Sequence, residues 1–229
     1  MFDGRFRVQV EKVVRPVGET LRKTGLSPDH LTLLGMLVAV AAAVSIGAGA
    51  LQLGLLLVIC SALPDLLDGA LAKASNSASQ RGAFFDSVVD RVTDALLFGG
   101  VAWYFATTKD PRWSLVPFAV MGVSMLISYE RAKAESLGLN AKGGLMERAE
   151  RIIVLCVGLL FESLIVWIMV AMLLLVTMTA VQRFVKVWRQ AAVAPTVAER
   201  IEVRRSRRAS RRARRDDYRA RFARRKRLS

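Results

Sequence analysis

Four aspartates in two closely spaced pairs are the residues of this chain whose types and spacing best suit chemistry. Asp65 and Asp68 stand three residues apart, and Asp86 and Asp90 stand four apart. On a helix, either spacing places both carboxylates of a pair on one face. Hard oxygen ligands in this number suit Mg²⁺ or Mn²⁺, and two such ions about 4 Å apart can support a displacement at phosphorus. The spacing therefore predicts a site for two divalent ions that acts on a phosphate group.

The segments that carry these aspartates are strongly apolar. The chain has 229 residues, of which 53% are hydrophobic, and its apolar residues form blocks of roughly 20 residues, which is the length that spans a bilayer. We expect an all-α membrane protein with six transmembrane helices. The predicted spans are residues 31–49, 51–72, 84–106, 114–135, 146–162 and 163–187.

Placing carboxylates near such spans is energetically unfavourable. Each one costs about 2.5–3.5 kcal/mol at mid-bilayer, and less near the interface. The simpler interpretation is that these acids are helix caps or interfacial charges paired with Lys73, Arg81 and Arg91. The combined spacing of the four acids, with glycines at 69 and 82, favours bound cations instead.

Two segments flank the membrane region. Residues 1–26 mix apolar and basic side chains, which predicts an amphipathic helix at the membrane surface. Residues 27–189 form the predicted membrane domain, and residues 190–229 form a basic tail with fifteen Lys or Arg between Arg200 and Arg227. The tail is typical of a disordered segment attracted to anionic lipid headgroups. Nucleic acid is a weaker alternative and is not expected, because no aromatic stacking platform accompanies the charges.

The distribution of positive charge among the connections predicts the orientation. Two connections, residues 73–82 and 131–151, are rich in Lys and Arg, whereas the connections on the other side hold only Lys109 and Arg112 beside Asp110. Short connections with excess positive charge face the cytoplasm. We therefore expect a multi-pass protein of the cell (inner) membrane with both termini in the cytoplasm.

The run from Asp65 to Asp90 resembles the signature D-x2-D-G-x2-A-R-x8-G-x3-D-x3-D of the CDP-alcohol phosphotransferase family. The one departure is Lys73 at the position of the arginine, which keeps the positive charge but loses the planar fork that can hold a phosphate bidentately. The resemblance covers roughly residues 5–188. It implies an enzyme, often a homodimer, that moves a phosphatidyl group from CDP-diacylglycerol to a polar alcohol.

The resemblance also implies roles for individual residues. Asp65, Asp68 and Asp86 would bind two Mg²⁺ or Mn²⁺ ions, and Asp90 would act as the base and approach the second ion. CDP-diacylglycerol would be bound by seven residues: Asp29, His30, Leu31, Thr32, Gly69, Lys73 and Ser79.

A second segment narrows the choice of acceptor alcohol. Residues 128–151 resemble the S-Y-x-[KR]-A-[KR]-A-E and G-G-x-x-E-R-x-E-R segments of bacterial phosphatidylinositol phosphate synthases. By that resemblance, Arg131, Arg151 and Arg183 would bind the phosphate of inositol phosphate, a dianion that needs cationic partners. Glycerol 3-phosphate is the alternative acceptor. The simpler interpretation is that these arginines anchor the helices by reaching the interface.

Two functions from other classes are also considered. A small cation transporter would use intramembrane acids as an ion path, but it predicts acids distributed across the depth of the bilayer. The four motif acids lie toward one face instead, with only Asp94 a turn deeper. A catalytically silent membrane anchor would depend on the basic tail, so deletion of residues 190–229 should abolish its role while an enzyme keeps its turnover.

Overall fold

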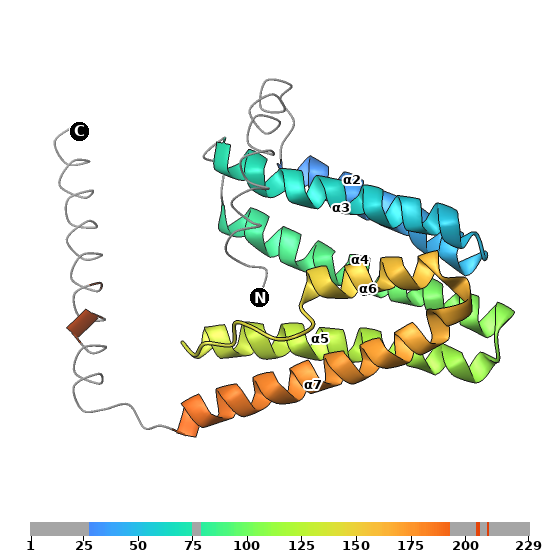
Figure 1. Cartoon of the computed structure of the whole chain (residues 1–229). Helices are drawn as coiled ribbons and strands as arrows, with labels where there is room; N and C mark the ends of the chain where they lie inside the picture. Colours follow the sequence, from blue (N-terminus) through green and yellow to red (C-terminus); the bar gives the residue numbers. More distant parts are fainter. Residues whose placement is uncertain (1–27, 75–78, 193–204, 207–209, 211–229) are drawn as a thin grey trace. The chain divides into compact units, whose positions relative to one another are not determined.

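Helices account for every regular element in the described part of the chain (Figure 1). The computed structural model describes residues 28–74, 79–192, 205–206 and 210, and for Pro28 and residues 63–74 it describes the backbone alone. The predicted surface helix at residues 1–26 therefore lies outside the described residues, as does most of the basic tail. The helices are α2 (Pro28–Gly47), α3 (Leu51–Ala74), α4 (Gln80–Thr108), α5 (Leu115–Ser136), α6 (Arg148–Leu160) and α7 (Ile165–Ala192), with short 3-10 turns η1 (Pro111–Ser114) and η2 (Glu162–Leu164).

The chain divides into two units between Val185 and Lys186, inside α7. The first unit holds α2 to α6 and most of α7, and the description that follows concerns this unit. The second unit contributes the last turns of α7, where the Gln190 side chain donates to the Lys186 carbonyl, and a few described residues of the tail.

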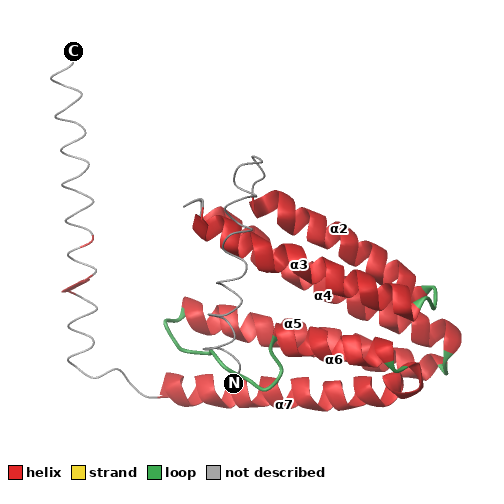
Figure 2. Cartoon of the chain, turned by 45° about the horizontal axis from the view of Figure 1, so that its top comes forward, coloured by secondary structure: helices red, strands yellow, loops and turns green. Residues whose placement is uncertain are grey.

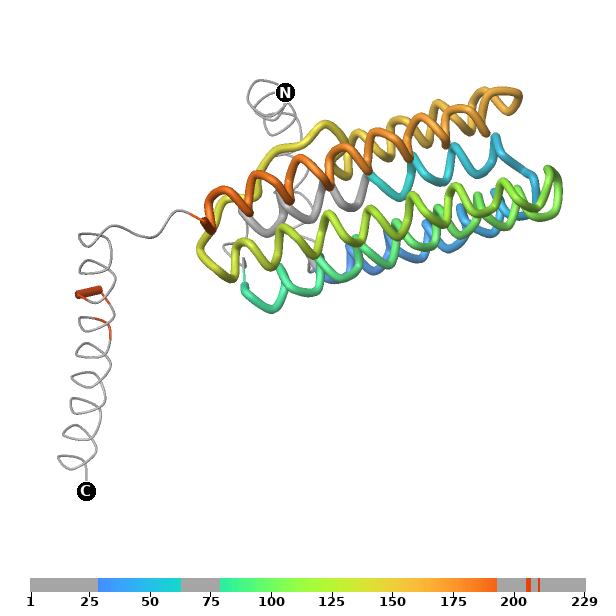
Figure 3. Tube along the Cα trace, turned by 90° about the horizontal axis from the view of Figure 1, so that it is seen from below, coloured from blue at the N-terminus to red at the C-terminus, as the bar shows by residue number. Residues whose placement is uncertain are grey.

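The helices of the first unit run alongside one another (Figures 2 and 3). Helix α2 packs against both α3 and α4. The contact with α4 is very close at Gly100, where a Cβ would lie 2.5 Å from the Ala43 carbonyl oxygen. Small residues allow helix backbones to approach in this way. Ala39, Ala42 and Ile46 of α2 are fully buried at this packing.

The turn between α6 and α7 is bonded to the end of α4. The Tyr104 hydroxyl of α4 donates to Glu162 Oε1 at 2.7 Å, and Lys109 Nζ lies 3.8 Å from the same oxygen. Leu159 of α6 and Ile165 of α7 are fully buried beside this turn. This end of α4 is therefore held to the α6–α7 turn by apolar packing, the buried Tyr104 hydroxyl and an ion pair at the surface.

Three helical segments of the described residues are long and apolar enough to cross a membrane: Asp29–Gly47, Pro111–Ser136 and Glu162–Ala192. Large apolar side chains such as Leu37, Phe118 and Trp167 are exposed on their outer faces, as expected of helices that contact lipid. The protein is a multi-pass membrane protein. The six segments predicted as spans are all helical, although α6, with 13 residues, is about 20 Å long.

Candidate active site

The start of α4 brings together two residues that the sequence analysis assigned to the nucleotide. Ser79 precedes the helix, and its side chain accepts a hydrogen bond of 3.0 Å from the Gly82 amide, which caps the first turn. A Cβ at Gly82 would lie 3.3 Å from Ser79 Oγ and 3.7 Å from Asp29 Oδ1. The Asp29 carboxylate of α2 therefore lies beside the first turn of α4, where glycine leaves space.

The other predicted nucleotide contacts are placed differently. His30 is exposed, whereas Leu31 and Thr32 are buried in the packing of α2. At Gly69 and Lys73 the structure describes the backbone alone. The structure therefore brings Asp29 and Ser79 together, and it leaves the remaining contacts as predictions.

Asp86 and Asp90 lie one turn apart on α4. The Asp90 side chain is 18% exposed and contacts two arginines: Arg148 Nη1 lies 2.9 Å from Oδ1, and Arg91 Nη1 lies 3.3 Å from Oδ2. Asp90 is thus oriented by its partners and still reachable from solvent.

Part of the predicted metal site can be placed. Among the side chains that the structure describes, no three Asp, Glu, His or Cys groups lie close enough together to hold a metal ion. Asp65 and Asp68 are not among those side chains. Asp86 and Asp90 fit the donor set of a divalent ion, because both carry hard carboxylate oxygens on one face of a helix.

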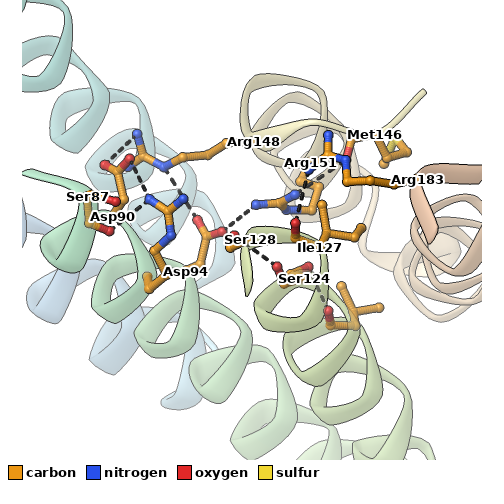
Figure 4. A network of polar contacts seen from close by, with 12 residues as sticks. Ser87, Asp90, Asp94, Ser124, Ile127, Ser128, Met146, Arg148, Arg151 and Arg183 are labelled. Carbon is orange, nitrogen blue, oxygen red and sulfur yellow. Dashed lines mark hydrogen bonds and ion pairs between the residues drawn. The ribbon is translucent and has the colours of Figure 1, made fainter. Parts of the chain in front are cut away.

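Asp94 lies one further turn along α4 and forms the centre of a polar network (Figure 4). It is 4% exposed. Its Oδ2 accepts a 2.7 Å hydrogen bond from Arg151 Nη2, and its Oδ1 lies 3.6 Å from Arg148 Nε. Arg148 and Arg151, three residues apart on α6, therefore face Asp90 and Asp94, four residues apart on α4.

Each of the three arginines predicted to bind the acceptor phosphate has a carboxylate partner. Arg131 is the exposed member, and its Nε lies 3.1 Å from Glu135 Oε1. Arg151, 3% exposed, pairs with Asp94 and also donates to the Met146 carbonyl at 3.3 Å.

Arg183 is the third of these arginines and joins several segments. It is 4% exposed. Its Nη1 donates to the Ile127 carbonyl of α5 at 3.0 Å, and its Nη2 donates to the Gly143 carbonyl at 3.1 Å. Nη2 also lies 3.4 Å from Glu147 Oε1. Helix α5, the connection to α6 and α7 are therefore held together by one guanidinium.

The connection between α5 and α6 lies against α7 at a glycine pair. Gly143 has a φ of +92°, which favours glycine. A Cβ at Gly144 would lie 2.6 Å from Thr179 Cγ2, and the Met146 amide donates to Thr179 Oγ1 at 3.1 Å. The glycines of the G-G-x-x-E-R segment thus allow the connection to reach Arg183.

The three arginines are close enough to influence one another. Four charged side chains act electrostatically on the Arg183 guanidinium: Arg131, Arg151, Glu130 and Glu147. Residues 131, 151 and 183 come from α5, α6 and α7, so the fold brings guanidinium groups from three helices together with their carboxylate partners. Binding of the acceptor phosphate by these three arginines stays a prediction.

Comparison with known proteins decides the family. The family model described as CDP-alcohol phosphatidyltransferase matches residues 26–181. The chain belongs to this family. The match includes both aspartate pairs and extends to α7, so the protein is a CDP-alcohol phosphatidyltransferase and an enzyme.

Curated relatives of the phosphatidyltransferase carry related names. The phosphatidylinositol phosphate synthase of Mycobacteroides abscessus is 37% identical over 154 residues, which is 66% of this chain and 70% of the relative. The archaetidylinositol phosphate synthase of Methanothermobacter thermautotrophicus is 33% identical over 192 residues, which is 82% of this chain and 94% of the relative.

Solved structures of the phosphatidylinositol phosphate synthase of Mycobacterium tuberculosis have the same fold. The form with CDP-DAG bound has a TM-score of 0.75 and 30% identity, and the match covers 81% of this chain and all of the other. The form with manganese and citrate has a TM-score of 0.72 and 31% identity, and covers 76% and 88% of the two chains. The alternatives of a cation transporter and a silent anchor do not account for this membership.

Asp94 and Arg148 had no predicted role in the phosphatidyltransferase. The sequence does contain a pattern that points to Asp94: Asp86, Asp90 and Asp94 repeat every fourth residue and so lie along one face of a helix. Their arginine partners are far away in the sequence, and the pairing became visible only in the fold.

Proposed function

We propose that this enzyme transfers the phosphatidyl group of CDP-diacylglycerol to a hydroxyl of inositol phosphate and releases CMP. The observation that supports this acceptor is the group of Arg131, Arg151 and Arg183 from three helices. Arg151 pairs with Asp94, one turn along α4 from Asp90. A phosphate-bearing alcohol needs such partners, and an uncharged alcohol does not need them in this number. The named relatives support the same acceptor.

Asp90 is the proposed base of the reaction. It removes the proton from the acceptor hydroxyl, whose oxygen then forms a bond to the phosphorus next to diacylglycerol. The bond from this phosphorus to the oxygen of CMP breaks, and CMP leaves with that oxygen. Arg148 and Arg91 contact the two oxygens of Asp90 and hold its carboxylate in a fixed orientation.

Asp65, Asp68, Asp86 and Asp90 are the proposed ligands of two Mg²⁺ or Mn²⁺ ions. Such ions, when bound, neutralise charge that develops on the phosphate oxygens during displacement. The M. tuberculosis relative contains manganese, which supports a divalent ion. Asp29, His30, Leu31, Thr32, Gly69, Lys73 and Ser79 are the proposed contacts of CDP-diacylglycerol, and the position of Asp29 beside Gly82 supports a nucleotide site at the start of α4.

The proposed topology has six transmembrane helices in residues 27–189, with both termini in the cytoplasm of a cell-membrane protein. Residues 1–26 lie on the membrane surface as an amphipathic helix, and the basic residues of 190–229 contact anionic lipids. The polar site then opens to the cytosol, where inositol phosphate and CMP are dissolved, while the acyl chains remain in the inner leaflet. We further propose a homodimer.

The acceptor is tested by incubating the purified protein with CDP-diacylglycerol, Mg²⁺ or Mn²⁺, and single alcohols while CMP release is measured. We expect release with inositol phosphate and little with glycerol 3-phosphate, free inositol or serine. Release with glycerol 3-phosphate alone would contradict inositol phosphate as the acceptor but would still agree with the proposed phosphatidyl transfer. No release with any alcohol would contradict both.

A further inference from the structure

Asp94 is a buried carboxylate for which the reaction described above has no use. It is 4% exposed, and its strongest contact is with Arg151, which is 3% exposed. The two atoms, Asp94 Oδ2 and Arg151 Nη2, are 2.7 Å apart and hydrogen-bonded. The residues are separated by 57 positions and lie on different helices. The contact therefore fixes a side chain of α6 from α4.

Asp94 has a second cationic neighbour, and the distances decide between the two. Arg148 Nε lies 3.6 Å from Asp94 Oδ1, which is an ion pair beyond the range of a good hydrogen bond. Arg148 has a closer partner in Asp90, at 2.9 Å. Asp94 therefore fixes Arg151 more strongly than it fixes Arg148, and its main effect should fall on the acceptor side.

Arg151 keeps hydrogen-bonding capacity after it has paired with Asp94. A guanidinium has five N–H donors in a rigid plane. In the described part of the protein, Arg151 donates through Nη2 to Asp94 and through Nη1 to the Met146 carbonyl, while its buried Nε has no hydrogen-bond partner. The Nε of Arg183 is also buried without one. Each guanidinium therefore keeps an N–H donor that no described protein group accepts.

We propose that Asp94 is a positioning residue that fixes the Arg151 guanidinium for the phosphate of the acceptor. Asp94 itself touches no substrate and acts through Arg151. The inference rests on the proposed function, because it assigns Arg151 to the acceptor phosphate. It adds a specific cause for the orientation of that arginine.

Stability alone does not account for this ion pair. A buried ion pair is often no more stabilising than apolar residues of similar volume, because both charges must be desolvated. Helices α4 and α6 are also joined one turn away by Asp90 and Arg148. A fixed orientation of a planar donor, in contrast, is what bidentate binding of phosphate requires.

The test is steady-state kinetics of Asp94→Asn, with KM for inositol phosphate, KM for CDP-diacylglycerol and kcat measured separately. We expect KM for inositol phosphate to rise about 10- to 100-fold, because a charge-assisted hydrogen bond to Arg151 becomes a neutral one. KM for CDP-diacylglycerol should change less than about twofold, because the proposal assigns Arg151 to the acceptor phosphate and not to the nucleotide. A purely structural residue would lower the amount of active enzyme and leave both KM values unchanged.

The matched control is Asp110→Asn, which makes the same chemical change at an exposed cap of η1, beyond the far end of α4. We expect all three kinetic constants of this control to stay at the wild-type values. Unchanged KM for inositol phosphate in folded Asp94→Asn would overturn the inference. If Asp94→Asn does not fold, Asp94→Glu decides, because it keeps the buried charge but moves it by one methylene. This variant should raise the same KM by less.

The outcome for Asp94 can be separated from the outcome for the acceptor. If the wild-type protein uses glycerol 3-phosphate instead of inositol phosphate, the proposed acceptor is wrong. Asp94→Asn should then raise the KM for glycerol 3-phosphate, because Arg151 would bind that phosphate. Unchanged KM for whichever phosphate acceptor is used would overturn the role of Asp94 alone.

Discussion

The middle of α4 and its C-terminal end are joined to the α6–α7 hairpin by different means. Near the middle of α4, Asp90 and Asp94 form ion pairs with Arg148 and Arg151 of α6. Near its end, Tyr104 donates one hydrogen bond to Glu162, which also forms a solvent-exposed ion pair with Lys109. Buried ion pairs are costly to desolvate and gain little stability, whereas a hydroxyl among apolar side chains costs less. Under the proposed function, the buried ion pairs near the middle of α4 serve the reaction, and the contacts near its end serve packing.

The largest effect is expected from Asp90→Asn, near the middle of α4. The amide cannot accept a proton from the acceptor hydroxyl, so kcat should fall about 10²- to 10⁴-fold, which is the usual contribution of a general base. Its thermal unfolding should stay close to that of the wild type, since Asn can still accept hydrogen bonds from Arg148. CMP release and a melting curve provide the measurement. Wild-type turnover in this variant would refute the assignment of the base.

Arg183→Lys is expected to have the next largest effect. Lysine keeps the charge, but it cannot reach the Ile127 and Gly143 carbonyls and an anion with one planar group. KM for inositol phosphate should rise about 10- to 100-fold through loss of charge-assisted hydrogen bonds. Arg189→Lys, on the exposed last turn of α7, is the control and should behave as the wild type. An equal effect of both variants would remove the reason for placing Arg183 in the acceptor site.

The packing of α4 against α2 is tested by Gly100→Ala. The new Cβ would lie 2.5 Å from the Ala43 carbonyl oxygen, so the helices must separate, at a cost of about 1–3 kcal/mol in unfolding free energy. Gly99→Ala is a matched control, because a Cβ there has no atom within 4 Å. Thermal unfolding in detergent measures both. Equal stability of the two variants would show that the close approach has no energetic importance.

The smallest effect is expected from Tyr104→Phe at the far end of α4. It removes the hydroxyl that donates to Glu162, and we expect a loss of about 1–2 kcal/mol in unfolding free energy, in the range for hydrogen bonds to charged groups. All kinetic constants should remain at wild-type values. A selective rise in KM for the acceptor would contradict the division of α4 into a middle part that serves the reaction and an end that serves packing.

The all-helical fold follows from local sequence patterns and was predicted correctly. Apolar blocks separated by short polar connections predicted six helical segments, and three described segments are long and apolar enough to cross a membrane. The glycines at 143 and 144 belong to the segment that suggested an acceptor site, and Gly143 has the positive φ that favours glycine. The family itself was carried by the spacing of the aspartates.

The positions of the residues predicted to contact the nucleotide could not be derived from such local patterns. The segment from Asp29 to Thr32 was predicted to contact the nucleotide as a whole. In the fold, Asp29 lies beside Gly82, while Leu31 and Thr32 are buried. Successive residues of a helix point in different directions, and nucleotide contacts at His30, Leu31 and Thr32 stay predictions.

The sequence alone determined that this chain is an all-helical membrane protein with paired aspartates suited to divalent ions, because periodicity, hydrophobicity and ligand chemistry are properties of short segments. Only the tertiary structure decided which charge meets which. Asp94 and Arg151 are 57 residues apart, and Arg183 lies 56 residues from the Ile127 carbonyl that it contacts. Such pairings depend on how whole helices pack. A single ion pair contributes too little energy to determine that packing by itself.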